Sequence, residues 1–180
     1  MDDSVLILRT CNEDMTSRGG FVWPSSGFVE ALDWNPAPVC GGGLHGLLWG
    51  EGSHDYLDLS ETAKWVVFRA KLNDVAHGSG DLINKCKAKC GVVEYCGDRD
   101  GAVQYVVTHG GTGKRVVFGT ATAGDSGTAT AGVNGVIAIQ YWNGKRYKTH
   151  IGHVKDEDGD GELEPNTKYR LVAGAFSVVT

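Results

Sequence analysis

The densest group of chemically reactive side chains lies in the segment Cys40-Gly-Gly-Gly-Leu-His45-Gly. A thiol beside an imidazole can act as a nucleophile, and glycines let a ligand approach the backbone closely. Cys40 and His45 are therefore the candidate catalytic residues. Such a pair also needs a group that orients the histidine, and the sequence offers three carboxylates without choosing among them: Asp33, Asp55 and Asp98.

Three interpretations of this segment stay open. The first is a catalytic thiol, and the second is a pocket for a nucleotide or another small ligand, formed by Trp23, Cys40, His45 and Trp49. The third is a structural turn with a hydrogen-bonded histidine. Some folds that transfer ADP-ribose combine a glycine-flanked histidine with an aromatic-rich sheet, and that resemblance would give three further residues a role: Trp65, Glu94 and Tyr95.

A second candidate site is acidic. Asp156, Asp158 and Asp160 occupy positions 1, 3 and 5 of a loop that resembles the opening of an EF-hand. Position 12 is Thr167, where calcium-binding loops carry a bidentate glutamate. Two interpretations remain: a calcium site, calcium being the one cofactor that the sequence suggests, and a solvated acidic hairpin. The candidate metal ligands are Asp156, Asp158, Asp160 and Glu162.

The composition is that of a folded chain. Its 180 residues correspond to one domain, or to one domain with a small appendage. The 27 glycines are well above the roughly 7% of average usage and the four prolines are few, so we expect tight turns and exclude a collagen-like or disordered chain. The formal net charge of −5 disfavours nucleic acid and anionic membranes as partners.

The cysteines and the first residues bear on the compartment. Five cysteines are an odd number, and the acidic residues after Met1 do not resemble a secretory signal peptide. We therefore expect reduced thiols in a cytosol and no export by a signal peptide.

Basic residues form two groups. Lys85, Lys87 and Lys89 alternate along one expected strand, and the second group lies within 145–148. Lysine on an exposed strand opposes edge-to-edge pairing, so we expect both groups to protect sheet edges.

Residues 1–115 show the mixed pattern of an α+β domain. Runs of β-branched and other apolar residues predict strands over 4–10, 64–71 and 92–96. Helical spacing after Asp98 predicts one main helix over 98–109.

Residues 116–180 change to a short repeat. Gly-Thr-Ala-Thr-Ala-Gly occurs at 119–124 and at 127–132, and another glycine follows at 135, which gives a period of eight residues. Alternation places the threonines on one face and the alanines on the other. Two such units form a single coil of a β-solenoid, which is too small to bury its own interior. We expect another copy to stack on this coil, or three strands to cap it: 136–142, 146–154 and 168–172.

The segment Phe21-Val-Trp-Pro, the Cys40 segment and the octapeptide repeats together resemble an uncharacterised domain family of bacteria and their phages. In that family a domain with a Cys-Gly-Leu-His motif precedes ice-nucleation-like repeats and a closing module similar to Glu164-Pro-Asn-Thr-Lys-Tyr-Arg-Leu. The resemblance implies a phage or prophage setting and no particular activity. Family members often carry long repeat arrays, whereas this chain has barely two units, which argues against ice templating.

The sequence thus predicts a β-rich α+β fold and a non-enzymatic structural or interaction protein of a bacteriophage. We expect a virion accessory, such as a capsid cement or decoration protein, found in the virion or the host cytoplasm. Its partners would be itself or other virion proteins, joined through exposed strand edges and not through nucleic acid or membrane. The alternative is a nucleotide- or small-ligand-binding domain, or an ADP-ribosyltransferase-like enzyme, around Cys40 and His45.

Overall fold

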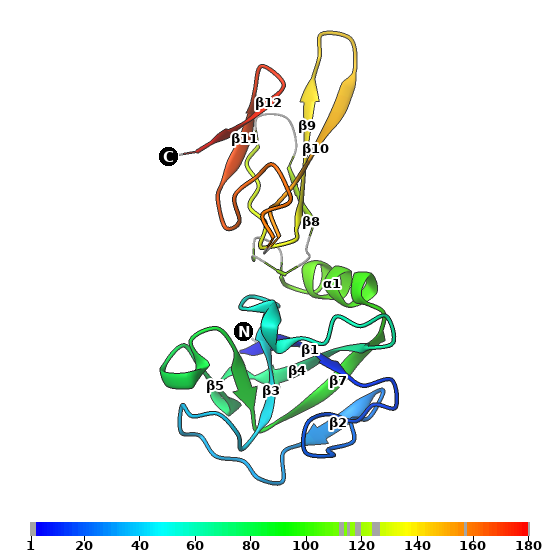
Figure 1. Cartoon of the computed structure of the whole chain (residues 1–180), viewed down its shortest axis with the longest axis vertical. Coiled ribbons are helices and arrows are strands. Elements are labelled where there is room, and N and C mark those ends of the chain that lie inside the picture. Colours follow the sequence, from blue (N-terminus) through cyan, green and yellow to red (C-terminus); the bar gives the residue numbers. More distant parts are fainter. Residues whose placement is uncertain are drawn as a thin grey trace. The chain divides into compact units, whose positions relative to one another are not determined.

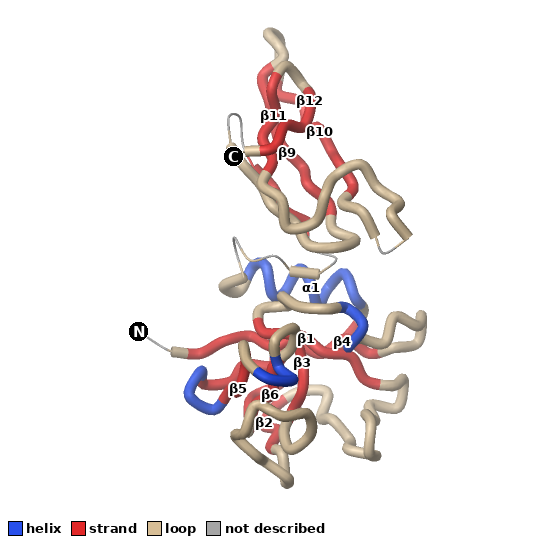
Figure 2. Tube along the Cα trace, turned by 60° about the vertical axis from the view of Figure 1, so that its left-hand side comes forward, coloured by secondary structure: helices blue, strands red, loops and turns tan. Residues whose placement is uncertain are grey.

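The chain divides into two units, Met1–Thr112 and Gly113–Thr180, and each has its own sheets and core. The computed structural model describes residues 3–111, 114, 116–117, 120–123, 127–156 and 158–179. Figures 1 and 2 show the elements of each unit.

The N-terminal unit is built on a seven-stranded sheet in the order β2-β7-β4-β1-β3-β6-β5, with every neighbouring pair antiparallel (Figure 1). Short 3-10 helices at His54–Tyr56, Leu72–Asp74 and Gly80–Leu82 lie in its connections. The strands are β1 (Ser4–Cys11), β2 (Gly27–Glu30), β3 (Leu44–Leu48), β4 (Lys64–Lys71), β5 (Val75–His77), β6 (Cys86–Ala88) and β7 (Cys90–Gly97).

β1 and β4 lie inside this sheet because both of their faces are apolar. Leu6, Ile7 and Leu8 of β1 are fully buried, and so is the run 66–68 of β4. Continuous apolar runs are typical of strands that are covered on both sides. The helix α1 (Arg99–Thr108) packs against β1, β4 and β7 (Figure 1).

α1 has a local reason to begin and end where it does. The Oδ1 atom of Asp98 accepts a hydrogen bond from the N–H of Gly101 at 2.8 Å, which caps the first turn. The N–H of His109 donates to the carbonyl of Tyr105 at the last turn. Glycine at position 101 leaves room for the hydroxyl of Tyr95, which a Cβ atom there would displace.

The C-terminal unit holds two smaller sheets. β8 (Thr120–Ala123), β9 (Val136–Trp142) and β10 (Tyr147–His153) lie in the order β10-β9-β8, and β11 (Tyr169–Val172) pairs with β12 (Ala175–Val178). The buried core of this unit consists of small and aliphatic residues with one tyrosine: Ala129, Ala131, Ile137, Ile139, Val154, Leu163 and Tyr169.

The expected α+β class with a main helix and a β-solenoid is wrong, because the described structure is mostly β. The predicted helix is present as α1, but it has ten residues and covers part of a large antiparallel sheet. Segments that resembled loops in the sequence form the short strands of that sheet, since distant partners supply their hydrogen bonds. Among the described strands, β8 and β9 are the one parallel pair, and β10 pairs antiparallel with the other edge of β9, so the parallel pairing does not continue past β9.

Candidate functional site

Cys40 lies in an exposed turn between β2 and β3. Its Sγ atom lies 3.3 Å from the Nζ atom of Lys85, and its N–H donates to Oδ2 of Asp81 at 3.0 Å. The ammonium of Lys85 also lies 4.4 Å from the ring centroid of Tyr56. The hydrogen-bond partner of the thiol is therefore a lysine and not His45.

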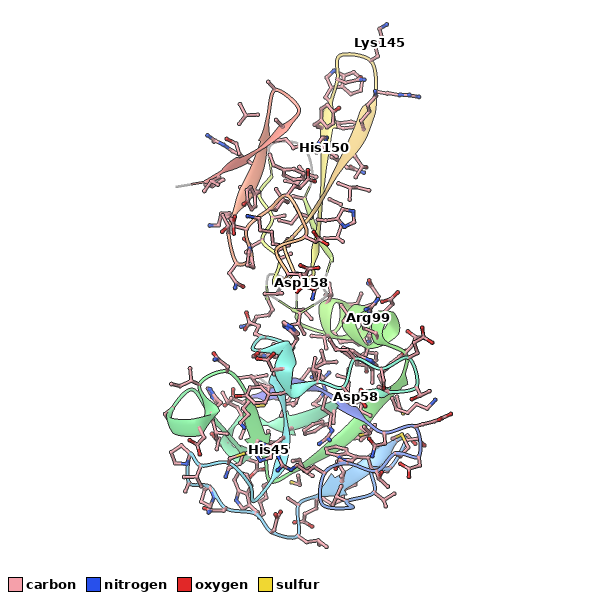
Figure 3. All side chains as sticks on the ribbon, in the orientation of Figure 1. His45, Asp58, Arg99, Lys145, His150 and Asp158 are labelled. Atoms are coloured by element: carbon pink, nitrogen blue, oxygen red, sulfur yellow. The ribbon has the colours of Figure 1, made fainter. Side chains whose placement is uncertain are left out.

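His45 lies on β3 and faces the same turn (Figure 3). Its Nε2 atom accepts a hydrogen bond from the N–H of Gly41 at 3.2 Å, which assigns the proton of the neutral ring to Nδ1. In the described part of the chain this buried Nδ1 atom has no hydrogen-bond partner. Burial, followed by the charges of Lys85 and Lys87, lowers the pKa of His45, so the ring is neutral at pH 7. This geometry supports the interpretation of a histidine that holds a turn.

The three carboxylates considered as orienting groups have other positions. Asp55 accepts a hydrogen bond from the hydroxyl of Ser53 at 2.6 Å, and Asp98 caps α1. The backbone carbonyl of Asp33 lies against Gly42. Among the described residues, no carboxylate is bonded to His45, so the structure does not assemble a catalytic triad there.

The two tryptophans considered for a ligand site lie in different surroundings. Trp23 is buried, with its ring centroid 5.4 Å from that of Phe68 and 4.0 Å from the guanidinium carbon of Arg9. Arg9 also donates to the carbonyl of His45 at 3.2 Å, which links Trp23 to the turn. The backbone N–H of Trp49 instead donates to the carbonyl of Leu6 at 2.7 Å. A ligand site formed by Trp23, Cys40, His45 and Trp49 stays a prediction.

Glu94 and Tyr95 lie beside α1, while Trp65 is buried in β4. Arg69 donates to both carboxylate oxygens of Glu94, from Nε at 2.8 Å and from Nη2 at 3.0 Å. The hydroxyl of Tyr105 donates to the same carboxylate at 3.1 Å, and burial together with this contact raises the pKa of Tyr105. The carboxylate is thus engaged in linking β4, β7 and α1.

The acidic segment forms a tight turn in the C-terminal unit. Oδ1 of Asp156 accepts a hydrogen bond from the N–H of Asp160 at 2.8 Å, and Lys155 forms an ion pair with Glu164. Within the described residues, no three His, Cys, Asp or Glu side chains come together in a way that could hold a metal ion. Calcium binding by the four candidate ligands stays a prediction: Asp156, Asp158, Asp160 and Glu162.

Lys87 was expected to protect a sheet edge, and this expectation is wrong. The residue is fully buried in β6, which lies between β3 and β5. Its Nζ atom donates to the carbonyls of Val39 at 2.9 Å and Gly41 at 2.8 Å, so it fastens the Cys40 turn to the sheet. No residue near Lys87 in the chain indicates this role, because the two carbonyls belong to a distant segment.

The octapeptide repeat forms a parallel strand pair with a regular spacing. β8 pairs with β9 from Thr120↔Val136 to Ala123↔Ile139, so paired residues are sixteen positions, or two octapeptides, apart. We call the two octapeptides, residues 119–134, the repeat coil; residues 119 and 124–126 lie outside the described residues. The other edge of β9 is paired with the antiparallel β10, so a further parallel strand cannot follow on that side.

A different segment covers the second octapeptide. Ala129 and Tyr169 exchange both backbone hydrogen bonds, at 3.0 and 2.9 Å, and the N–H of Asn166 donates to the carbonyl of Ala131 at 2.9 Å. Each octapeptide of the repeat coil is therefore bonded on one side, the first by β9 and the second by 166–169. We call β9, β10 and residues 166–172 together the cap.

The alanines and threonines of the second octapeptide occupy opposite faces. Ala129 and Ala131 are buried in the core, Thr128 is exposed and Thr130 is partly exposed. Ala123 of the first octapeptide packs against the same core. The predicted alternation is confirmed for residues 128–131, and it leaves threonine hydroxyls on the outside of the repeat coil.

Curated proteins similar to the chain are bacterial ice nucleation proteins. InaU of Pantoea ananas is 38% identical over 109 residues, which are 60% of this chain and 10% of that protein. An ice nucleation protein of Pseudomonas fluorescens is 44% identical over 73 residues, 41% of this chain and 6% of that protein. One of Xanthomonas campestris pv. translucens is 31% identical over 107 residues, 59% of this chain and 7% of that protein.

The chain spans a tenth or less of the length of these relatives. The match of 109 residues is longer than the C-terminal unit, so it includes part of the N-terminal unit. No family model and no solved structure matches the chain.

These relatives correct the predicted setting. They are bacterial proteins named for ice nucleation, so the prediction of a bacteriophage virion accessory, capsid cement or decoration protein is wrong. The ice-nucleation-like character of the repeats is supported. The error arose because the phage setting came from a resemblance of motifs and not from any residue that contacts a capsid. In the part of the chain that the structure describes, no helix is both long and apolar enough to cross a membrane.

Proposed function

We propose that the C-terminal unit is the closing end of an ice-nucleation-type repeat stack, and that the chain acts in ice nucleation when further coils join its repeat coil. The sixteen-residue register between β8 and β9 carries this proposal. This register defines a sixteen-residue coil that further coils can extend on the side of β8 away from β9. On the opposite side, the antiparallel β10 ends the stack. The similarity to bacterial ice nucleation proteins supports the same conclusion.

The exposed threonines give the chemistry of the proposed surface. A threonine hydroxyl both donates and accepts hydrogen bonds, so a regular row of them can order water at fixed spacing. Two strands in one parallel ladder lie about 4.8 Å apart, and stacked coils would repeat the row at that distance. One coil contributes only one step of such a row, so we expect the number of coils to determine the activity.

The experiment inserts extra copies of residues 119–134 directly before Gly119 of the full chain. We expect the freezing temperature of supercooled droplets to rise as one, two and four copies are added. The matched control carries the same insertions with Thr→Val at every inserted threonine, which keeps the side-chain shape and removes the hydroxyl. Hydrogen exchange across the inserted coils establishes that they are folded.

Two results would count against the proposal. Folded insertions that leave the freezing temperature unchanged would show that the coil does not order water. A rise of equal size in the valine control would show that the hydroxyls have no part in it.

We propose separately that the N-terminal unit, which carries the Cys-Gly-Gly-Gly-Leu-His segment, belongs to a domain family distinct from the repeat segment. A turn fastened by Lys87, with a neutral His45 against Gly41, supports a structural role for that segment.

A further inference from the structure

The turn between β9 and β10 presents two aromatic rings to solvent. Trp142 is 50% exposed and Tyr147 is 61% exposed, although side chains of this size are usually buried. The two residues are directly opposite each other in the β9–β10 ladder, with ring centroids 5.2 Å apart at 62°. The pair closes the β9–β10 ladder next to Lys145, and Figure 3 shows Lys145 at one end of the unit.

Three cations accompany this aromatic pair. Lys145, Arg146 and Lys148 are all exposed, and in the described part of the chain none of them forms an ion pair with a carboxylate. The sequence has no Asp or Glu between positions 136 and 153. The hairpin end is therefore a strongly basic patch on a chain whose formal net charge is −5.

The turn holds these residues in a fixed arrangement. Oδ1 of Asn143 accepts hydrogen bonds from the N–H groups of Lys145 and Arg146, each at 3.0 Å. The N–H of Asn143 donates to the carbonyl of Arg146 at 3.2 Å, and Gly144 takes the positive φ of 90° that the turn requires. A preformed turn reduces the entropy that a ligand would have to overcome.

We propose that this hairpin end, residues 142–148, binds single-stranded nucleic acid. Stacking of a base on an exposed aromatic ring and attraction of phosphates to nearby cations are the two contacts that such ligands use. Both occur here within seven consecutive residues, and the acidic segment around Asp158 lies at the other end of the unit (Figure 3). The attraction of phosphates is therefore local and does not require a basic chain.

A membrane surface fits the same residues less well. A hairpin that inserts into a bilayer interface places its apolar side chains at the apex and its cations behind them. Here Lys145 and Arg146 occupy the turn itself, while Trp142 and Tyr147 lie on the strands behind it. The arrangement suits a flexible polymer that can reach both the charges and the rings.

The test measures binding of a fluorescein-labelled oligothymidylate to the full chain by anisotropy at low salt. Stacking by one aromatic residue corresponds to about 1–3 kcal/mol, so we expect Trp142→Ala to weaken binding roughly 5- to 150-fold. Three phosphate contacts predict a slope of about −2 for log K against log salt, and Lys145→Ala should reduce its magnitude by about 0.7. Each of these residues is exposed, so the variants should fold, and unchanged hydrogen exchange of Ile139 would establish this.

Lys168→Ala is the matched control, because it removes one exposed positive charge from the same unit away from the hairpin. It should leave the affinity nearly unchanged. The proposal is overturned if the oligonucleotide does not bind at low salt, if Trp142→Ala binds as well as the wild type, or if Lys168→Ala weakens binding as much as Lys145→Ala. It is also overturned if phosphatidylglycerol vesicles bind through Trp142 while the oligonucleotide does not.

Discussion

Tyr169 tests whether the cap is what keeps the repeat coil folded. The residue is 5% exposed, its hydroxyl accepts a hydrogen bond from the N–H of Glu164 at 2.8 Å, and its backbone is paired with Ala129. Truncation of a large buried aromatic side chain typically costs about 3–5 kcal/mol. Whole domains are stable by only about 5–15 kcal/mol, and small units lie at the lower end. Tyr169→Ala should therefore remove most of the stability of the C-terminal unit.

Hydrogen exchange with mass spectrometry gives the readout for each unit separately. A loss of about 3–5 kcal/mol corresponds to a roughly 150- to 4000-fold decrease in protection. We expect this decrease for Ala129 and for β8 and β9, with β1 and β4 unchanged. Tyr147→Ala removes an exposed tyrosine from the same unit and should change protection little. If Tyr169→Ala lowered protection only around β11 and left Ala129 and β8 as in the wild type, the reasoning that the cap supports the coil would be refuted.

Two further predictions concern the N-terminal unit. Burial lowers the pKa of His45 in the folded chain, so below the unfolded value of about 6.5 the unfolded state binds more protons and the free energy of unfolding falls with decreasing pH. Chemical unfolding of the wild type and of His45→Gln between pH 7 and pH 5 should show a smaller fall in the free energy of unfolding for the variant. Parallel curves for the two proteins would contradict this prediction. Burial raises the pKa of Cys86, whereas Cys40 is exposed. Iodoacetamide should therefore label Cys40 in the native protein and Cys86 only after unfolding, as peptide mapping would show. Labelling of Cys86 in the native protein as fast as Cys40 would contradict this prediction and show that its strand opens readily.

Local pattern was sufficient for the longer elements. The predicted strands at 64–71 and 136–142 agree with β4 and β9, and the helix predicted over 98–109 is α1 at Arg99–Thr108. In each case the signal lies in the segment itself: an apolar β-branched run, or a cap followed by helical spacing. The predicted cap strands at 146–154 and 168–172 likewise correspond to β10 and β11.

The rest depended on contacts between distant residues. β3 contains His45 and Gly46, and β6 contains Lys87, so neither segment has the composition of a buried strand. They become strands because they pair with each other and with β1 and β5. The same holds for the candidate site, since nothing near Cys40 in the sequence indicates that Lys85 would be its neighbour. Because these short strands were not predicted, the single helix carried too much weight and the fold was assigned to the wrong α+β class.

The two partners of the repeat coil constrain how such a segment can change length. The first octapeptide is bonded to β9 and the second to the segment at Tyr169, so the two are not interchangeable. Duplication of a single octapeptide would shift the register by half a coil, so that β9 and the segment at Tyr169 would each face the wrong octapeptide. Duplication of sixteen residues would keep the first octapeptide beside β9 and the second beside Tyr169. Genes that encode this design should therefore gain or lose whole coils, and half-coil variants should be rare among functional alleles.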